Sequence, residues 1–388
     1  MKKIILYILF IISCAKLFAQ QTITEQQVID TILNNNYLLS NAMLKIDAQR
    51  ALQKTSWNIS DPEIFVEQNP FESLTLSVEQ TFDFPSQYIK QGQLNREKTA
   101  LSEKEYAVTK SELLKNIRLL YLQAQYASAK LNYLQLQDSV FNQIKDASAK
   151  SFESGNTNYL EKIFAETKYG EMHQQFINEQ AELVKLKKQI SILTAIQYDF
   201  AVTELAKLNV KNDSIMILQN PSYLYAEQNV KVTQKQYEAV KAQVMPDILL
   251  GYTAPLKEDA VYTPAYKAGI SIPLWVNAYS GNNAAAKAEI AIAENKLRIQ
   301  EKNLIQQKTD ALTAYYGNEQ TVRYYEKEGL PNATEITKTA MRLKESGEID
   351  FMNYLRTLND AFEIQLNYIE ALRNYNSSVI EIDYLNGN

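Results

Sequence analysis

The chain has 388 residues and a formal net charge of −5, which argues against a nucleic-acid partner because such proteins carry an excess of basic residues. Only ten glycines and nine prolines occur, so turns are few and the elements between them should be long. Tyrosine is frequent, at 25 residues, and this side chain favours boundaries between apolar and aqueous surroundings, including membrane interfaces.

Residues 1–19 have the parts of a secretory signal peptide. Lys2 and Lys3 precede an apolar run at 4–12, and small residues lead to Ala19, after which we expect cleavage. An alternative is lipoprotein processing at Cys14, the only cysteine. With ordinary cleavage the mature chain has no cysteine, so packing alone must hold it together.

The rest of the chain contains two structural repeats, predicted as residues 20–206 and 207–388. Each repeat is predicted to contain a helix, two strands, a long helix, a tight turn and a further helix. Landmarks recur in the same order at an offset of about 190 residues. The recurring landmarks are 34–38 and 220–224, 61–64 and 245–248, Phe84-Pro85 and Ile272-Pro273, Gly92 and Gly281, and Glu153-Ser154-Gly155 and Glu345-Ser346-Gly347.

Helical periodicity in the first repeat predicts helices at about 25–57, 86–150 and 158–196. The longest of these would measure about 95 Å at 1.5 Å per residue, which favours a rod, a coiled coil or a tube over a compact globule. The last helix of the chain has two adjacent apolar seams, as expected for a helix with neighbours on both sides. One seam contains Leu358, Phe362, Ile369, Leu372 and Val379, and the other contains Ala361, Ile364, Tyr368, Ala371 and Tyr375.

Four strands are predicted, at about 62–68, 73–84, 247–254 and 261–273. They alternate between an apolar and a polar face, which fits a transmembrane barrel with lipid outside and water inside. A half-buried sheet in a soluble protein would alternate in the same way, but the signal peptide and the long helices favour the barrel. The residues predicted to face lipid are Leu74, Leu76, Val78, Phe82, Tyr262, Tyr266, Ile270 and Ile272.

The strands are also the only predicted means of membrane insertion. No segment after the signal peptide has eighteen consecutive apolar residues, and only helices and closed barrels pair all their backbone groups in lipid. Four strands cannot close a barrel around a channel, so the barrel must be shared between subunits of a homo-oligomeric ring. The predicted fold class is therefore mainly α with a membrane β-barrel.

Together these features resemble the TolC family of outer-membrane efflux proteins, over essentially the whole mature chain. The resemblance rests on the two-repeat layout, the Asn-Pro-Ser-Tyr-Leu sequence at 220–224, the strand pairs bounded by proline, and the two Ser-Gly turns. It implies a homotrimer with a twelve-stranded barrel on a periplasmic α-helical tunnel, acting as a passive duct for efflux or type I secretion. Residues 61–71 look closest to the branch that serves heavy-metal exporters.

The resemblance also implies partners and functional positions. In the family, the turns after the long helices form the periplasmic tip, where an adaptor protein docks together with an inner-membrane pump. These turns are Ser154-Gly155 and Ser346-Gly347, and glycine suits such a reversal of the chain. Many members close the tip with aspartates at the two positions that Asn353 and Arg356 occupy here. Glu161 and Asp350, the nearest acidic residues, are candidates to replace them.

No catalytic or cofactor-binding pattern is present, so no enzyme activity, cofactor or metal site is predicted. The single histidine, His173, has no Glu or His at metal-site spacing, and phosphate-binding loops and nucleophile motifs are missing. Two other classes were considered, a periplasmic adaptor and a soluble coiled-coil scaffold. An adaptor would need compact β-modules beside one hairpin, whereas two hairpins are predicted. Outer-membrane fractionation would distinguish a soluble scaffold from a membrane channel, because only the channel should be found in that fraction.

Overall fold

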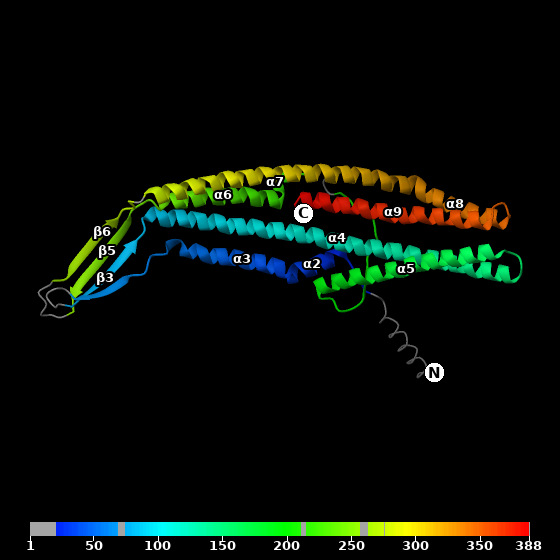
Figure 1. Cartoon of the computed structure of the whole chain (residues 1–388), viewed down its shortest axis with the longest axis horizontal. Helices are drawn as coiled ribbons and strands as arrows, with labels where there is room; N and C mark the ends of the chain where they lie inside the picture. Colours follow the sequence, from blue (N-terminus) through cyan, green and yellow to red (C-terminus); the bar gives the residue numbers. More distant parts are fainter. Residues whose placement is uncertain (1–20, 69–73, 211–214, 257–262, 275, 388) are drawn as a thin grey trace, which may run out of the picture.

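The structure is a computed structural model that describes residues 21–68, 74–210, 215–256, 263–274 and 276–387. The predicted signal peptide, Cys14 and Tyr262 lie outside the described residues. The molecule is elongated: its helices lie side by side along the long axis, the main sheet lies at one end, and the helical hairpin turns lie at the other (Figure 1).

The first repeat follows the predicted order, with one additional break. The first predicted helix is divided at Asn36, because the Asn36 side chain accepts hydrogen bonds from the backbone N–H groups of Leu38 and Leu39 and so starts a new helix. The long helix has 69 residues and begins with Pro85 in its first turn, where a missing N–H is harmless. The elements are α2 (Glu25–Asn35), α3 (Tyr37–Gln53), a 3-10 turn (Lys54–Trp57), β2 (Glu63–Gln68), β3 (Leu74–Phe82), α4 (Pro85–Glu153) and α5 (Tyr159–Thr194).

The second repeat has the same order, but its long helix is interrupted by a π-turn, Tyr325–Gly329. Pro331, just beyond this turn, has no N–H to donate the next helical hydrogen bond, and the wider π-turn accommodates this missing bond. Gly329 is buried there, and a Cβ atom on it would lie only 2.7 Å from the Tyr325 ring. The elements are α6 (Pro221–Ala242), β5 (Asp247–Pro255), β6 (Ala265–Ser271), α7 (Val276–Tyr324), the π-turn, α8 (Leu330–Glu345) and α9 (Phe351–Leu385).

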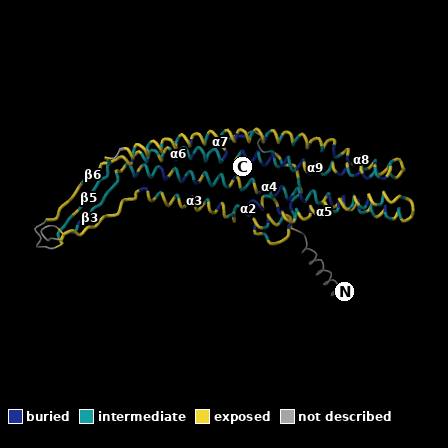
Figure 2. The backbone as a smooth tube through the Cα atoms, viewed as in Figure 1, coloured by how far each residue is buried: buried dark blue, intermediate teal, exposed yellow. Residues whose placement is uncertain are grey.

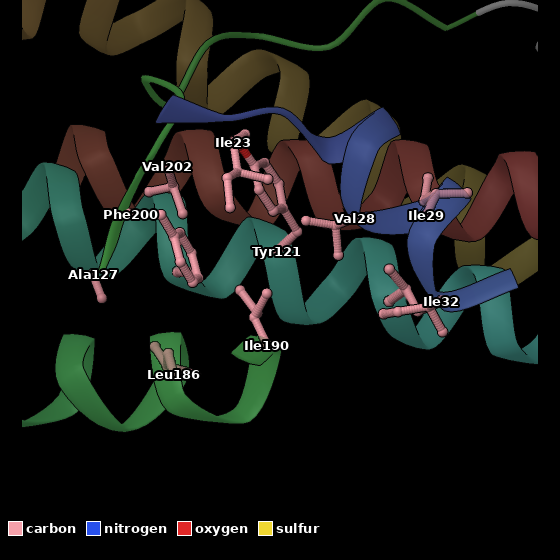
Figure 3. Close-up of a cluster of buried hydrophobic side chains, with 12 residues drawn as sticks. Ile23, Val28, Ile29, Ile32, Tyr121, Ala127, Leu186, Ile190, Phe200 and Val202 are labelled. Carbon is pink, nitrogen blue, oxygen red and sulfur yellow. The ribbon is translucent and has the colours of Figure 1, made fainter. Parts of the chain in front are cut away.

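A short parallel ribbon that the sequence did not predict ties the start of the described chain to the segment after α5. It consists of β1 (Gln21–Ile23) and β4 (Phe200–Val202). Tyr121 of α4 is completely buried beneath it; its hydroxyl donates to the Ile23 carbonyl at 2.6 Å and accepts from the Thr203 N–H at 3.0 Å. A cluster of buried apolar side chains surrounds this tyrosine (Figure 3). Strands of three residues are too short for a periodic signal in sequence.

The last helix, α9, has neighbours on both sides, as its two seams predict. Leu358 and Phe362 pack with Phe141 of α4, and Ala371 and Tyr375 pack with Val322 of α7. Val379, predicted in the first seam, instead packs in the second cluster. This corrects one position of the seam and leaves the two-sided packing as predicted.

An ion triad joins the two repeats at the middle of the helical part. Arg118 of α4 is 2.8 Å from Glu25 of α2 and 2.8 Å from Asp383 of α9. The Asp383 side chain is only 4% exposed, whereas that of Arg118 is 19% exposed. A buried carboxylate of this kind depends on its cation, because ionised groups are strongly unfavourable in the interior without a partner.

Replacing Arg118 with alanine should therefore destabilise the protein by about 3 kcal/mol, the lower end of the range for breaking a buried pair, since Arg118 is partly exposed. Thermal unfolding of the detergent-purified protein measures this. The control is Arg50→Ala, which breaks only exposed pairs and should cost less than about 1 kcal/mol. Adding Asp383→Asn to Arg118→Ala should recover part of the loss. Equal losses for Arg118→Ala and Arg50→Ala would contradict the assignment.

Candidate functional site

The four strands of the main sheet share an apolar face. The sheet is antiparallel with the order β2-β3-β5-β6, and its register aligns apolar side chains in rows across the strands. Tyr266 and Ile270 on this face are 88% and 67% exposed. An exposed apolar face of this kind, although Gln80 of β3 interrupts it, marks a surface made for a partner or for lipid. The aligned rows are Val66, Leu76 and Ala254; Ile64, Val78, Tyr252 and Tyr266; and Phe82, Ile248 and Ile270.

The opposite face of the sheet is mostly polar, although Phe65 and Leu249 also lie on it, and several of its polar side chains bond to one another across the strands. Lys267 of β6 forms an ion pair with Glu79 of β3 at 2.6 Å, and the hydroxyls of Ser77 and Thr253 lie 2.9 Å apart. Thr75 on this face is only 9% exposed. The two faces therefore differ in chemistry in the way that the alternating sequence predicts, with the apolar side chains pointing away from the polar network.

The described strands agree closely with the predicted ones, except at β6. Leu74, Leu76, Val78 and Phe82 lie on the apolar face of β3, and Tyr266 and Ile270 on that of β6. β6 is shorter than the predicted strand and ends at Ser271, so Ile272 follows it as an exposed residue of the connection to α7. Contact of these residues with lipid stays a prediction.

The described subunit has two lateral edges without partners. In the sheet, β2 and β6 are each paired on one side only. In the helical part, the contacts run in the order α3, α4, α6, α7, so α3 and α7 lie on opposite edges and are largely exposed (Figure 2). Exposed residues recur on both outer helices at coiled-coil spacing. They are Tyr37, Asn41, Leu44, Ala48 and Ala51 on α3, and Gly281, Ala285, Ala288, Ile292, Asn295 and Ile299 on α7.

The two predicted hairpin turns have the same conformation. Gly155 and Gly347 adopt φ angles of 73° and 74°, in the left-handed region that favours glycine. The N–H of the residue after each glycine reaches back to the helix, from Asn156 to Ser151 and from Glu348 to Leu343. This is the Schellman arrangement that ends a helix and reverses the chain. The turns thus follow from the glycines, as predicted.

A groove of about 350 Å³ lies between the two hairpins at this end of the molecule. Ser148, Ser151 and Glu161 contribute from the first hairpin, and Phe351 and Tyr354 from the second. Burial raises the pKa of the Tyr354 hydroxyl, and the Glu345 carboxylate raises it further, so this hydroxyl stays protonated. The sequence did not identify the groove, because its walls come from segments about 200 residues apart.

The two acidic gate candidates both serve in helix caps. Asp350 accepts a hydrogen bond from the Asn353 backbone N–H at 2.7 Å, and the Asn353 amide donates to its second oxygen, also at 2.7 Å. Glu161 accepts from the Thr157 hydroxyl and from the side-chain amide of Asn158, which in turn caps the same helix. An aspartate at 353 would place a second negative charge beside Asp350 instead of a donor. Asn353 therefore fits its surroundings better than the acidic residue expected from the family.

The single histidine, His173, forms one side-chain hydrogen bond and one ring contact. His173 is half-buried, with its Nδ1 atom 2.8 Å from an Asp138 oxygen and its ring stacked on Tyr169. The Asp138 partner lies on another helix and gave no signal in the sequence.

Over the described ranges, no group of three or more His, Cys, Asp or Glu residues is placed to hold a metal ion. Nor does any helix in the described part of the chain have the length and hydrophobicity to cross a membrane.

Comparisons with known proteins agree with this architecture. Residues 214–388 match the family model described as outer membrane efflux protein. No curated protein matches the chain in sequence. Among solved structures, the chain is similar to the CusC channel with a TM-score of 0.79 and 17% identity, covering 94% of this chain and 92% of that one. It is also similar to the outer membrane channel CmeC of Campylobacter jejuni, with a TM-score of 0.79, 15% identity and coverages of 94% and 85%. A third similar structure is the outer membrane protein VceC of Vibrio cholerae, with a TM-score of 0.78 and 14% identity, covering 94% of this chain and 96% of that one.

The fold over the whole described chain is that of solved outer-membrane channels, mainly helical with a small β part, as predicted. With the family match, it defines the class of protein as an outer-membrane channel that extends into the periplasm, rather than an enzyme. The sequence match to the outer membrane efflux protein model, over residues 214–388, lies within the second repeat.

Proposed function

We propose that the chain is one subunit of a homotrimeric, passive export duct, open through the outer membrane and closed at its periplasmic tip until an adaptor and an inner-membrane pump engage it. The observation that carries this proposal is the incomplete sheet. The main sheet, in the described part of one chain, has four strands, two edges without a partner and an exposed apolar face. In lipid, each unpaired backbone group costs several kcal/mol, so the edges must be paired by further copies.

The helical edges support the same assembly. A ring closes when one edge of a subunit contacts the opposite edge of the next, so β6 would pair with the neighbour's β2 and α7 would pack on the neighbour's α3. The exposed stripes of α3 and α7 have the spacing that such helix contacts require. Three copies would bring twelve strands together, enough to enclose a channel.

The tip is the proposed docking site for the adaptor. Ser154-Gly155 and Ser346-Gly347 form two matching turns at the end farthest from the sheet, and the groove between the hairpins opens beside them. The groove has an apolar and aromatic wall at Phe351 and Tyr354 and a carboxylate at Glu161. These groups would accept a protein segment that presents both apolar and polar side chains.

The constriction of the duct is proposed at the first turns of the returning helices, where Glu161, Asp350, Asn353 and Arg356 lie. Asp350 and Asn353 form one hydrogen-bonded unit, and Arg356 is exposed about one turn further along α9. In a trimer each residue would appear three times around the bore. Closure would therefore depend on a mixture of charged and neutral groups instead of on aspartates alone.

The cargo is proposed to be a metal ion or another small solute, selected by the pump. The resemblance of residues 61–71 to the heavy-metal-exporter branch supports metal ions, and its described part, 61–68, includes β2. Expression of the chain with candidate pump and adaptor pairs, followed by growth on copper, zinc or drugs, tests this assignment. Protection against drugs but not against metals would contradict the assignment to metal ions and leave another small solute as the cargo.

The assembly is tested by outer-membrane fractionation. We expect the protein in that fraction as an oligomer of trimer mass that survives mild detergent at low temperature and dissociates on heating, because the barrel closes only between copies. Electrophoresis of unheated and heated samples measures this. A monodisperse monomer recovered from the soluble periplasm would rule out the proposed function and favour a soluble scaffold.

A further inference from the structure

A cavity of about 390 Å³ lies between the end of α3 and the start of α4, where the helices meet the sheet. Trp57, from the 3-10 turn after α3, and Tyr88, from α4, both line it, and their rings are stacked with centroids 5.1 Å apart. Trp57 is nevertheless 63% exposed, and Ile89 beside it is 51% exposed. The cavity is also lined by Arg96, so an aromatic and apolar wall and a cation border the same space.

This cavity lies on the same side of the molecule as the apolar face of the sheet. Gln87 of α4 donates a hydrogen bond to Asp247 at 3.2 Å, and Asp247 belongs to the polar face because it precedes Ile248 of the apolar one. Ile89 and Arg96 are rotated from Gln87 by about 180–200° around the helix. They therefore point to the side of α4 that continues the apolar face.

The chemistry of the cavity wall changes with distance from the sheet. The apolar strand β3 ends at Phe82, and Ile89 follows within the first two turns of α4. Arg96 is about 10 Å further along the helix, and helical side chains lean toward the N-terminus of their helix, which for α4 is the sheet end. With the strands in hydrocarbon, Trp57 lies at the boundary and the guanidinium among the headgroups, where tryptophan and long basic side chains are favoured.

Two donors at the cavity have no acceptor within the described ranges of the chain. Arg96 is exposed and forms no ion pair or hydrogen bond there, and the next residue, Glu97, accepts instead from Gln228 of α6. The indole N–H of Trp57 likewise has no acceptor in that part of the chain. The side chains that line the cavity include no carboxylate. Because a guanidinium binds phosphate oxygens in a bidentate manner, the charge of the cavity suits an anionic phosphodiester.

We propose that each subunit binds one phospholipid of the periplasmic leaflet in this cavity, with the phosphodiester at Arg96 and the beginning of the acyl chains against Trp57 and Ile89. The proposal rests on the proposed function, which places the sheet in the outer membrane. A phospholipid matches the order of the wall, since its apolar part lies toward the sheet and its phosphate lies further out. Such a bound lipid would fix the height of the duct in the membrane.

Native mass spectrometry of the purified oligomer, titrated in detergent with phosphatidylglycerol, tests the proposal. We expect saturation at one tightly bound lipid per chain. Arg96→Glu should weaken this binding by about tenfold or more, because it replaces a charge-assisted contact with repulsion. Trp57→Ala should weaken it by about threefold or more, through loss of the aromatic wall. The control is Arg298→Glu on α7, at an exposed arginine without a partner in the described chain and about 30 Å from the sheet end of that helix, which should bind lipid normally.

Fluorescence gives a second measurement that does not depend on detergent. The chain has two tryptophans, so Trp275→Phe leaves Trp57 as the only one. In vesicles of phosphatidylglycerol brominated near the start of its acyl chains, the emission of Trp57 should fall by about half or more, because the indole would contact those carbons. Adding Arg96→Glu should reduce this quenching.

Several outcomes would overturn the proposal. Equal lipid binding by Arg96→Glu and Arg298→Glu would show that the lipid merely surrounds the barrel. Displacement of the lipid by inorganic phosphate at equal concentration would assign Arg96 to a free anion. Unquenched Trp57 emission would show that a neighbouring copy covers the cavity. If Arg96→Glu prevents assembly, Arg96→Gln takes its place with the same expected direction. An oligomer in the outer membrane that binds no lipid would overturn this inference alone, whereas absence of the protein from that membrane would contradict the proposed function as well.

Discussion

Replacing Ile270 with arginine is expected to reduce the assembled oligomer in the outer membrane by at least about tenfold. Ile270 lies in β6 on the apolar face of the sheet and is 67% exposed in the single chain. A charged side chain on the lipid face of a barrel costs about 2–4 kcal/mol near the bilayer midplane. The amount of heat-labile oligomer, measured by immunoblotting of unheated membrane samples, reports the loss.

The neighbouring residue provides the matched control. Ser271 points to the opposite face and is exposed, so Ser271→Arg should assemble nearly as well as the unaltered protein. Thr75 would be a poor control although it lies on the polar face, because it is buried and donates a hydrogen bond to the Glu67 carbonyl. Equal losses for Ile270→Arg and Ser271→Arg would mean that the two faces of the sheet had been assigned wrongly.

Changing Gly347 to valine should abolish export while leaving the oligomer in the membrane. No atom lies within 4 Å of a Cβ added at this glycine, so the strain comes from its φ of 74°, which a β-branched residue strongly disfavours. The end of the hairpin would change shape where the adaptor is proposed to dock. The sheet, about 100 Å away at the other end of the long helices, has its own hydrogen bonds and should be unaffected.

Two measurements separate the effects of this substitution, namely the yield of heat-labile oligomer and the cross-linking of the tip to the adaptor. The same substitution at Gly155, which has the same conformation, tests the other turn. The control is Gly347→Asn, because asparagine tolerates the left-handed region and should retain export. Normal export and cross-linking in Gly347→Val would show that the turn only reverses the chain.

The long elements could be predicted because their signals extend over many residues. The helix predicted at about 86–150 is found as Pro85–Glu153, since a coiled-coil spacing repeated over so many turns has no alternative interpretation. The two hairpin turns were also predicted, because a glycine stands at the end of a long helical pattern in each repeat. The structure shows that both glycines adopt a positive φ. For β3, the alternation of apolar and polar residues predicted both the strand and its two faces.

Other features depend on local or distant contacts that a periodic pattern does not report. The break at Asn36 and the caps at Asp350 and Glu161 arise from single side chains that bond to nearby groups. An acceptor three residues before an amide, as in Asp350 and Asn353, is a capping signal that could have been recognised. The groove at the tip and the Arg118 triad could not, because each joins residues from opposite repeats.

The π-turn at Tyr325–Gly329 makes the two halves of this duplicated chain mechanically unequal. In α4 the backbone hydrogen bonds continue over 69 residues, so one unbroken helix connects the sheet to the tip and should resist bending. The corresponding helix of the second repeat is interrupted, because Pro331 breaks its ladder of hydrogen bonds about four turns before the hairpin turn. A trimer contains six hairpins of similar outline. Hairpins with a continuous long helix and hairpins with an interrupted one would alternate around the ring. The ring would therefore deform with threefold symmetry, although its outline approaches sixfold symmetry.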